Sequence, residues 1–529
     1  MRGPLASRLA PLLLVLAAAP AAPADESHPE VLIVVNASSP VSVAIGEYYR
    51  RARQVPESHV LALSIPAEDP TLATFAGEVT TREFFVKEIR DPIAAFLTEH
   101  GLRDEVRILV LAKGIPLRIS GPNVSMQTLL RDTRVAAVDA ELALLFSGKD
   151  GSPGVAGMAN SYYGSGEDFA SFRAAHPDAL LRYIVARLDG YALPLDAASG
   201  VPVDVKGLID RAQAKAEDGV WLIDTDPTQR PGLDAGNRVI LHPAAAIVKS
   251  LGGKVRLDAT PGFVSNATNL AGYASWGSND NADKGVPYYG RIQGRLYPGT
   301  FVPRAIALDL VSTSARTFAL KPAEYEQSLV ADLVHLGASG VAGNVFEPTL
   351  GGCARAPILF RRYAEGVPAG EAWARSVPYL GWMNVWVGDP LMTIGKPATV
   401  RPVDLDGDGV ADARDDCTEL PNSTQRDTDS DGIGNLCDAD FDGDGVVSTS
   451  WGVIAPAGPA GDFENLLLSW KRGPYDANRD LDGDGKVNES DAGLAQLWLL
   501  LPPGPPGARS ASGAGSKGDV RSGGSAGAR

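Results

Sequence analysis

The sequence predicts an α/β fold for most of the chain and a small, loop-rich module after it. Between residues 25 and 399, short continuous apolar runs alternate with amphipathic segments, which is typical of a mostly parallel sheet covered by helices on both faces. After residue 400, one acidic, glycine-containing pattern occurs four times, and two of the copies precede an amphipathic helix. These two observations define two structural parts in the 529-residue chain.

The apolar runs of the first part predict its strands. The first run, VLIVVN at 31–36, is followed by an amphipathic helical segment at 43–54, which Pro56 ends. The second run, at 59–65, precedes a predicted helix at 81–101. Further strands or strand-to-loop junctions are predicted at 106–119, 182–190, 219–226, 270–278, 304–314, 340–348 and 383–394.

The two ends of the chain differ from the rest in composition. Arg2 and Arg8, a short apolar core and an A-x-A site ending at Ala24 are typical of a secretory signal peptide over residues 1–24. No later run approaches the roughly eighteen apolar residues of a membrane span. Residues 502–529 are rich in Gly, Ser and Pro and predict a disordered tail. We therefore expect an exported protein, free or associated with the cell surface.

The acidic repeats predict calcium loops. A hard cation needs about six to eight oxygen ligands, and in DLDGDGVADARD the carboxylates stand at loop positions 1, 3, 5, 9 and 12, with a glycine at position 6 for the sharp turn. A disordered acidic spacer, the alternative, does not require that glycine in every copy. The predicted ligands, loop by loop, are Asp404, Asp406, Asp408, Asp412 and Asp415; Asp427, Asp429, Asp431, Asn435 and Asp438; Asp440, Asp442 and Asp444; and Asp480, Asp482, Asp484, Asn488 and Asp491.

The third copy is interrupted. Ser448 stands at its position 9, an insert at 451–461 follows, and Asp462 occupies the place of position 12 if the insert is left out. The insert puts this site in doubt. An apolar stripe follows each of the last two loops, and two loop–helix units of this kind should bury their stripes against each other. The stripes are Phe463, Leu466, Leu467 and Trp470, and Leu494, Leu497, Trp498 and Leu501.

Two families resemble this part of the chain. Residues 400–444, with their loop pattern and the Cys417 and Cys437 spacing, resemble thrombospondin type 3 repeats. Residues 440–501 look like a dockerin module, an EF-hand-like domain of two loop–helix halves. The dockerin resemblance implies a cohesin-type protein partner, selected by loop positions 10 and 11, which are here Thr449-Ser450 and Glu489-Ser490.

The cysteines and the distribution of charge along the chain limit the functions that are compatible with the sequence. Cys417 and Cys437 flank the second loop, and in an exported protein they should form a disulfide. Cys353 is left over and is best explained as an isolated, partly buried thiol, because no histidine motif lies near it. Residues 404–444 carry −12 of the net charge of −16. No basic stripe exists elsewhere, which argues against nucleic-acid binding.

Polar residues end many of the predicted strands. In a parallel sheet such residues surround the carboxyl edge, where ligands bind, so the group favours a cleft built from several loops. The alternative is that Asn, Asp, Ser and Gly simply make turns. The residues are Asn36, Lys113, Arg187, Asp189, Ser275, Trp276, Ser278, Asn279, Asp280, Ser312, Ser314, Arg316, Asn344, Glu347 and Asp389.

The segments VARLDG, GYASWGS and VGDPLM resemble the caspase–hemoglobinase group, especially gingipain-like cysteine peptidases. Taken whole, residues 25–399 look like an uncharacterised family of secreted bacterial proteins that carries the same elements. The resemblance implies a His-Gly pair at one strand end and a cysteine at the next. This chain has Trp276-Gly277 and residues 311–314, VSTS, instead, so a thiolate–imidazole mechanism is not available.

Two functions therefore remain open. In the first, the α/β domain is a non-peptidase binding scaffold, and the calcium module is a docking or adhesion unit for a protein partner. In the second, the domain is a hydrolase in which Ser312 is activated by Asp280, Glu347 or Lys113. Ca²⁺ is the only cofactor that the sequence predicts, since it has no phosphate-binding or dinucleotide motif and no histidine metal motif.

Overall fold

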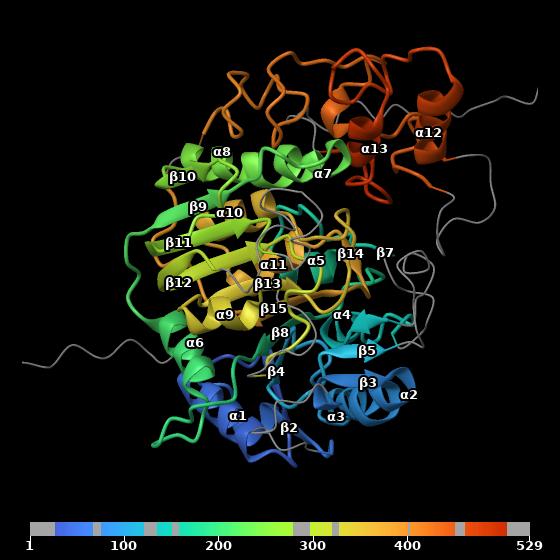
Figure 1. Ribbon diagram of the computed structural model, residues 1–529. Helices are drawn as coiled ribbons and strands as arrows, with labels where there is room; N and C mark the ends of the chain where they lie inside the picture. Colours follow the sequence, from blue (N-terminus) through green and yellow to red (C-terminus); the bar gives the residue numbers. More distant parts are fainter. Residues whose placement is uncertain are drawn as a thin grey trace, which may run out of the picture.

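A ten-stranded sheet runs through the α/β part of the chain (Figure 1). The computed structural model describes residues 27–66, 76–120, 135–150, 158–278, 297–319, 327–399, 402–449 and 461–504. From edge to edge the strands are β10 (Val255–Asp258), β9 (Val220–Asp224), β11 (Ala267–Ser275), β12 (Gly299–Asp309), β13 (Gly340–Asn344), β15 (Asn384–Gly388), β8 (Ile184–Leu188), β4 (Ile108–Ala112), β1 (Val31–Asn36) and β2 (Val60–Leu63).

The pairing confirms a mostly parallel α/β sheet. The β1–β2, β1–β4, β4–β8, β9–β10, β9–β11, β11–β12 and β12–β13 pairs are all parallel. The strand β15 is antiparallel to β13 along its whole length, and one bridge, between Val387 and Arg187, joins it to β8. Each predicted apolar run overlaps a strand of this sheet, and β11 and β12 begin a few residues before their runs. The edge strand β10 was not predicted, because its VRLD sequence is partly exposed and lacks an apolar run.

Helices cover both faces of the sheet, as the apolar runs predict. The side chains of Ile33 and Val35 on β1 point to one face and those of Leu32 and Val34 to the other, and all four are buried. The first face carries α1 (Pro40–Ala52), α6 (Val203–Gln213) and α9 (Val330–His335). The second carries α3 (Asp91–Glu99), α8 (His242–Ser250), α10 (Ala356–Ala364) and α11 (Ala369–Ser376).

Shorter elements complete the α/β part. A continuous helical segment leads into α8 and is formed by α7 (Pro231–Gly236) and the π-helical turn η5 (Asn237–Leu241). Two small sheets are formed by β3 (Val79–Thr81), β5 (Arg118–Ser120) and β6 (Ala136–Ala137), and by β7 (Met158–Ala159) and β14 (Tyr379–Leu380). The remaining helical pieces are α2 (Arg82–Phe84), η3 (Phe85–Arg90), α4 (Val138–Leu142), α5 (Phe169–Ala175), η1 (Glu57–His59) and η2 (Ala76–Glu78).

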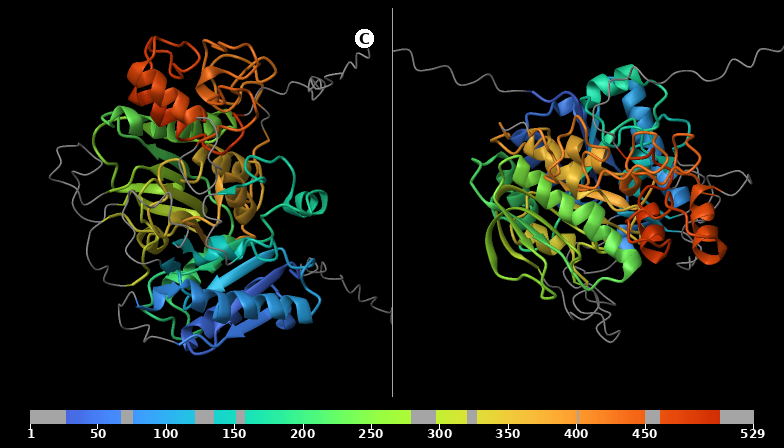
Figure 2. Two further views of the ribbon diagram at one scale, coloured as in Figure 1. Left: turned by 90° about the vertical axis from the view of Figure 1, so that its right-hand side faces the viewer. Right: turned by 90° about the horizontal axis from the view of Figure 1, so that it is seen from above.

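The C-terminal module lies across α7, η5 and α8 (Figures 1 and 2). It consists of acidic loops, the short turn η7 (Asn435–Cys437) and two helices, α12 (Asp462–Arg472) and α13 (Glu489–Ala495). Its apolar residues share one core with the α/β part: Leu494 and Trp498 belong to the same cluster as Val239 and Phe360. The module is therefore packed against the α/β part of the chain.

The expected mutual burial of the two helical stripes is only half right. The helices α12 and α13 do contact each other, and Phe463 and Leu466 are buried. However, α13 packs mainly on α7, and Trp470 at the end of the first stripe is 38% exposed. The helix α7 is far away in sequence, so its competition for the α13 stripe could not be seen from local spacing.

Candidate metal centre

Four groups of carboxylates come together in the module. In each group, three ligand oxygens lie within 4.8 Å of one another. The first three groups consist of positions 1, 3 and 5 of their loops, and the fourth consists of positions 1, 3 and 12. The groups are Asp404, Asp406 and Asp408; Asp427, Asp429 and Asp431; Asp440, Asp442 and Asp444; and Asp480, Asp482 and Asp491.

All four loops have one hydrogen-bonded frame. In the first loop, the position-1 carboxylate of Asp404 accepts the amide N–H of Gly407 at 2.7 Å and that of Gly409 at 3.0 Å. The equivalent pairs occur in the other three loops. The glycine at position 6 has a positive φ, such as +96° at Gly409, which few other residues adopt without strain. This frame turns the loop so that alternate carboxylates face one point.

The loops fall into two types according to the side chain that closes them. In the first and second loops the residue at position 9 accepts the N–H of position 2: Asp412 from Leu405 at 2.7 Å, and Asn435 from Thr428 at 2.8 Å. In the fourth loop, Asp491 at position 12 does this, accepting the N–H of Leu481 at 2.7 Å. Its second oxygen accepts the N–H of position 9 at 2.7 Å.

The third loop is closed in the same way as the fourth, despite its insert. Asp462 accepts the N–H of Phe441 at 2.9 Å with one oxygen and that of Ser448 at 2.7 Å with the other. Asp462 therefore occupies position 12. From the sequence, Asp462 falls at position 12 only if the insert is left out. The ligands predicted for this loop therefore did not include Asp462.

The other predicted position-12 residues lie close to their loops. Asp415 accepts the N–H of Cys417 at 2.9 Å and the Nε2–H of Gln425 at 2.9 Å through one oxygen. Its other oxygen is buried and has no hydrogen-bond partner among the described residues, and the same holds for Oδ2 of Asp406. Unpartnered buried carboxylate oxygens are what a site for an oxygen-liganded cation provides.

Burial and mutual repulsion make several of the loop carboxylates, Asp406, Asp438 and Asp491 among them, hard to ionise in the absence of a cation. Burial, with the neighbouring carboxylates, raises the pKa of Asp406 to about 8. Burial likewise raises the pKa of Asp438 to about 7 and that of Asp491 to about 6. A bound cation would offset this repulsion, and an all-oxygen ligand set suits Ca²⁺ better than Zn²⁺ or Cu²⁺. The residues present therefore fit calcium.

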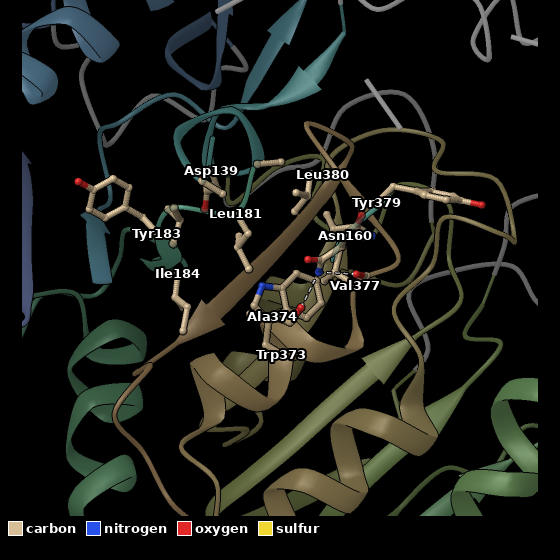
Figure 3. Close-up of a pocket in the computed structure, with 14 residues that line it drawn as sticks. Asp139, Asn160, Leu181, Tyr183, Ile184, Trp373, Ala374, Val377, Tyr379 and Leu380 are labelled. Carbon is tan, nitrogen blue, oxygen red and sulfur yellow. Dashed lines mark hydrogen bonds between the residues drawn. The ribbon is translucent and has the colours of Figure 1, made fainter. Parts of the chain in front are cut away.

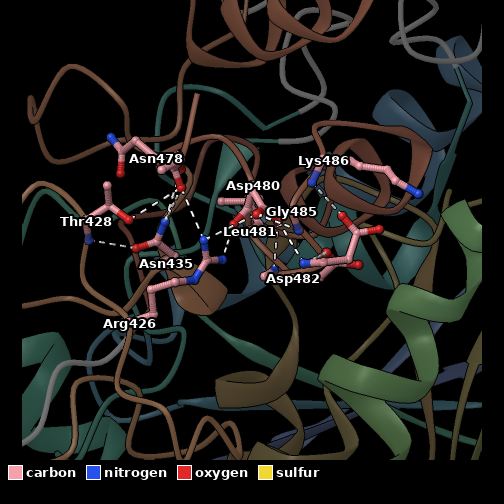
Figure 4. A network of polar contacts seen from close by, with 12 residues as sticks. Arg426, Thr428, Asn435, Asn478, Asp480, Leu481, Asp482, Gly485 and Lys486 are labelled. Atoms are coloured by element: carbon pink, nitrogen blue, oxygen red, sulfur yellow. Dashed lines mark hydrogen bonds and ion pairs between the residues drawn. The ribbon is translucent and has the colours of Figure 1, made fainter. Parts of the chain in front are cut away.

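The loops are joined to one another. Cys417 and Cys437 form a disulfide, as the sequence predicts. Across the module, the guanidinium of Arg426 donates to the carbonyl oxygens of Ala477 and Asp480, and the side-chain amide of Asn435 also donates to the Ala477 carbonyl, at 3.0 Å (Figure 4). The second and fourth loops are thereby held side by side.

The α/β part reaches into the module at several points. Arg238, on η5, lies 3.4 Å from the carboxylate of Asp482 at position 3 of the fourth loop. The hydroxyl of Ser250, at the end of α8, donates to the Leu405 carbonyl in the first loop at 2.8 Å. The guanidinium of Arg355 donates to the Leu497 carbonyl at 2.6 Å. Calcium binding in these loops would therefore affect the contacts that they make with the α/β part.

The candidate catalytic residues do not form a hydrogen-bonded group among the described residues. Lys113 pairs with Asp189 at 2.9 Å. Glu347 accepts the N–H of Thr349 at 2.9 Å. Ser312 is half-buried, and no hydrogen bond joins it to Lys113 or Glu347 within the part of the chain that the structure describes. Asp280, like Asn279, lies outside that part, so a role for either remains a prediction.

Several other strand-end residues hold the fold together. Arg187 is fully buried and paired with Asp139. The indole N–H of Trp276 donates to the side-chain oxygen of Asn237 at 2.8 Å. The remaining pairs include Ser278 with Ser328 and Asn384 with Asn344, each at 2.9 Å. For these residues the turn-making or structural explanation holds.

Asp389 does not belong with the other strand ends. It accepts a hydrogen bond from the Tyr49 hydroxyl at 2.8 Å and pairs with Arg53 at 2.5 Å, both at the C-terminal end of α1. Asn36, by contrast, lies beside the N-terminal end of α1, where its backbone N–H donates to Ser42. The expected place of Asp389 in the cleft was wrong because β15 is antiparallel to its neighbour β13.

A small cavity beneath the sheet is not a substrate site. It measures about 40 Å³ and is lined by Asp139, Asn160 and Trp373 among others (Figure 3). The amide of Asn160 donates to the carbonyls of Ala374 and Val377, both at 2.8 Å. This volume holds a water molecule or two.

Cys353 is the only free cysteine in the chain, and it is buried. Burial, followed by the charge of Glu347, raises the pKa of its thiol to about 12. The thiolate is therefore scarce at neutral pH. The sequence predicted an isolated, partly buried thiol, and the side chain is more deeply buried than that, at 4% exposure.

Comparisons with known proteins match the module. Residues 403–425 and 426–449 match the family model of the thrombospondin type 3 repeat, whose members bind calcium. Over 35 residues the chain is 57% identical to cartilage oligomeric matrix protein of Bos taurus and 54% identical to thrombospondin-4 of Xenopus laevis. These stretches are 7% of this chain and 5% and 4% of the two relatives, so the chain spans a small fraction of either protein. Thrombospondin type 3 repeats are thus shown in this part of the chain.

Solved structures similar to the chain include two peptidases. One, described only as a protease, has a TM-score of 0.36 at 11% identity and covers 69% of this chain and 78% of its own. The other, the Arg-specific cysteine proteinase gingipain R, has a TM-score of 0.33 at 10% identity and covers 70% and 80%. Likenesses at these scores carry no argument about activity. In the described residues, no helix is long and apolar enough to cross a membrane.

Proposed function

We propose that this is an exported calcium-binding protein in which Ca²⁺ fixes the C-terminal module onto a non-peptidase α/β scaffold. The observation that carries the proposal is the common frame of the four loops, each with carboxylate oxygens directed at one point. The contact of Arg238 with Asp482 places the fourth loop against the scaffold. Export is supported by the disulfide and by the occurrence of thrombospondin type 3 repeats in extracellular proteins.

The first test is thermal unfolding of the mature full-length chain with and without calcium. Because a ligand that binds only the folded state stabilises it, millimolar Ca²⁺ should raise the melting temperature relative to EDTA. Calorimetric titration should approach four ions per chain, one for each carboxylate group. Equal melting in EDTA and in calcium would refute the proposal.

The docking role is proposed for the outer face of α12. Leu468 and Trp470 are 53% and 38% exposed there, and the nearby Tyr475 is 57% exposed. The positions that the dockerin resemblance assigns to partner selection are only partly accessible. Thr449 is buried and bonded to Glu464, whereas Glu489 is exposed and lies beside Gly232 of α7. Thr449 is thus closed to a cohesin-type partner, which favours the α12 face.

A capture experiment tests this role. The mature chain is immobilised and offered proteins secreted by the same organism in calcium and in EDTA. A partner held in calcium should be lost in the double variant Leu468→Ser, Trp470→Ser, whose calcium stoichiometry should be unchanged. Retention of the partner by the double variant would assign docking to another surface.

The serine-hydrolase alternative rests on one feature. Ser312 is half-buried three residues beyond Asp309, the last residue of β12. The mature chain is assayed on a peptide and ester library before and after iodoacetamide. We expect no turnover that alkylation abolishes, because the Cys353 thiol is buried. Turnover that survives alkylation and is lost in Ser312→Ala would establish the alternative.

A further inference from the structure

A cavity lies at the junction of the module and the α/β part and is distinct from the calcium loops. It measures about 260 Å³. Its apolar wall comes from both parts of the chain: Val239 and Ile358 from the α/β part, and Leu420 and Trp498 from the module. For comparison, a cavity of about 150 Å³ is known to hold one benzene molecule. The space is therefore enough for a ring or short alkyl chain with a small polar group.

Two of the residues that line this cavity carry a donor without an acceptor. The Nε–H of Arg355 and the indole N–H of Trp498 are both buried and have no hydrogen-bond partner among the described residues. Arg355 is 2% exposed and Trp498 is 4% exposed, and both line the cavity. A buried donor without an acceptor is destabilising unless a ligand or water supplies one.

Arg355 also lacks a carboxylate partner within the described residues. Its terminal nitrogens donate to the carbonyls of Cys353, Gly351 and Leu497, which are neutral. Tyr163 lines the cavity as well, but burial raises the pKa of its phenol, so it stays neutral and cannot balance the charge. A buried cation ordinarily has an anion beside it.

The remaining charged residue limits the charge of the ligand. Glu419 lines the cavity and is paired with Arg361. A doubly charged phosphate beside this carboxylate would be repelled, whereas a monoanion can face Arg355. A carboxylate also matches the N–H donors of a guanidinium.

We propose that the cavity binds a small monocarboxylate with an aromatic or aliphatic body. The carboxylate would accept from Arg355 and Trp498, and the body would lie against Val239, Ile358 and Leu420. The inference rests on the proposed function only in that the module must be docked, because two walls of the cavity belong to the module.

The test is calorimetric titration of the mature chain in millimolar calcium with 3-phenylpropanoate, and with 3-phenylpropan-1-ol as the uncharged probe. We expect saturable binding of one carboxylate per chain. The affinity for the alcohol should be lower by roughly tenfold or more. Arg355→Gln should weaken 3-phenylpropanoate by roughly ten- to a hundredfold. Because Arg355 also ties the module in place, Ile358→Trp, which fills the cavity and keeps Arg355, should independently abolish binding.

The matched control is Leu257→Trp, which adds the same bulk at an exposed position, 47% accessible, on β10. It should bind like the parent chain. Absence of saturable binding by the parent chain, equal affinity for acid and alcohol, or unchanged binding in Ile358→Trp would each overturn the proposal. A calcium-dependent rise in melting temperature, measured on the same samples, shows separately whether the calcium proposal holds.

Discussion

At the scale of single residues, Asp462 and Asp491 close their loops in the same way, although different numbers of residues separate them from the start of the loop. Each closes its loop by accepting the N–H of positions 2 and 9. Asp491 follows its loop without interruption, whereas an eleven-residue insert, 451–461, precedes Asp462. The chain therefore keeps the closing carboxylate of the third loop despite the insert.

This equivalence gives the first prediction. Asp462→Asn and Asp491→Asn should each lower the calcium stoichiometry of the full chain by one ion, because each removes the charged oxygens that close one loop. Calorimetric titration measures the number of ions bound per chain. The control is Asp218→Asn, which changes an exposed carboxylate outside the loops. Loss of an ion in Asp491→Asn but not in Asp462→Asn would show that the third loop does not bind calcium.

A second prediction concerns Asp309, at the end of β12. Its carboxyl is 3% exposed, and burial raises its pKa to about 7, although Ser314, Val311 and Arg316 act in the opposite direction. Because the folded-state pKa is raised above the ordinary value of 3.8, the proton stabilises the fold at low pH. This stability is fully present below about pH 4 and is lost as pH rises through 7.

Asp309→Asn should remove that loss. The stability of the variant relative to the parent chain should be higher at pH 8 than at pH 4.5. The difference should be at most about 4 kcal/mol, since each pKa unit corresponds to about 1.4 kcal/mol. Unfolding in urea at both pH values, in saturating calcium so that the loops stay occupied, measures the difference. An equal effect of the substitution at both pH values would contradict a raised pKa.

At the scale of elements, the contact between α13 and α7 determines where the module sits. Gly493 and Gly232 pack so closely that a Cβ atom added to Gly493 would lie 2.4 Å from the Gly232 carbonyl oxygen. Small residues here let the two backbones approach, and the apolar stripe of α13, including Leu494, is buried as a result. A larger side chain would have to push the helices apart.

Gly493→Val should therefore destabilise the docked module by about 1–3 kcal/mol, the usual effect of overpacking. The expected signs are a lower melting temperature in calcium and faster proteolysis near residue 400, between the two parts. Ser490→Ala, on the same helix, is the control and should behave like the parent chain. A Gly493→Val variant that melts and resists protease as the parent chain does would show that this contact is not required.

The elements also show how far the sequence could be interpreted without a structure. The strands of the sheet other than β10 followed from apolar runs, because a strand buried on both faces needs no long-range information. The carboxylate groups at positions 1, 3 and 5 of the first three loops also followed from local spacing. The direction of β15, which carries Asp389 away from the other strand ends, depends on its neighbour β13 and could not be inferred locally. Nor could the burial of Trp498 at the junction, since its partners are distant in sequence.

At the scale of the whole molecule, the acidic loops of the module are packed against the α/β part of the chain. The module and the α/β part share an apolar core, and Arg238, Ser250 and Arg355 bridge them by polar contacts. If calcium orders the loops, the segment 231–250, which forms α7, η5 and α8, should be ordered with them. A module that is joined to the α/β part only by the polypeptide chain, without packing on it, would leave this segment unaffected.

Hydrogen–deuterium exchange of the mature chain, in millimolar calcium and in EDTA, tests this claim most directly. We predict slower exchange in calcium for the loops and also for residues 231–250 of the α/β part, because their helices pack on the ordered module. Strand β1, far from the module, should be the same in both conditions and serves as the internal control. Protection by calcium confined to residues 402–504, with 231–250 unchanged, would contradict the account.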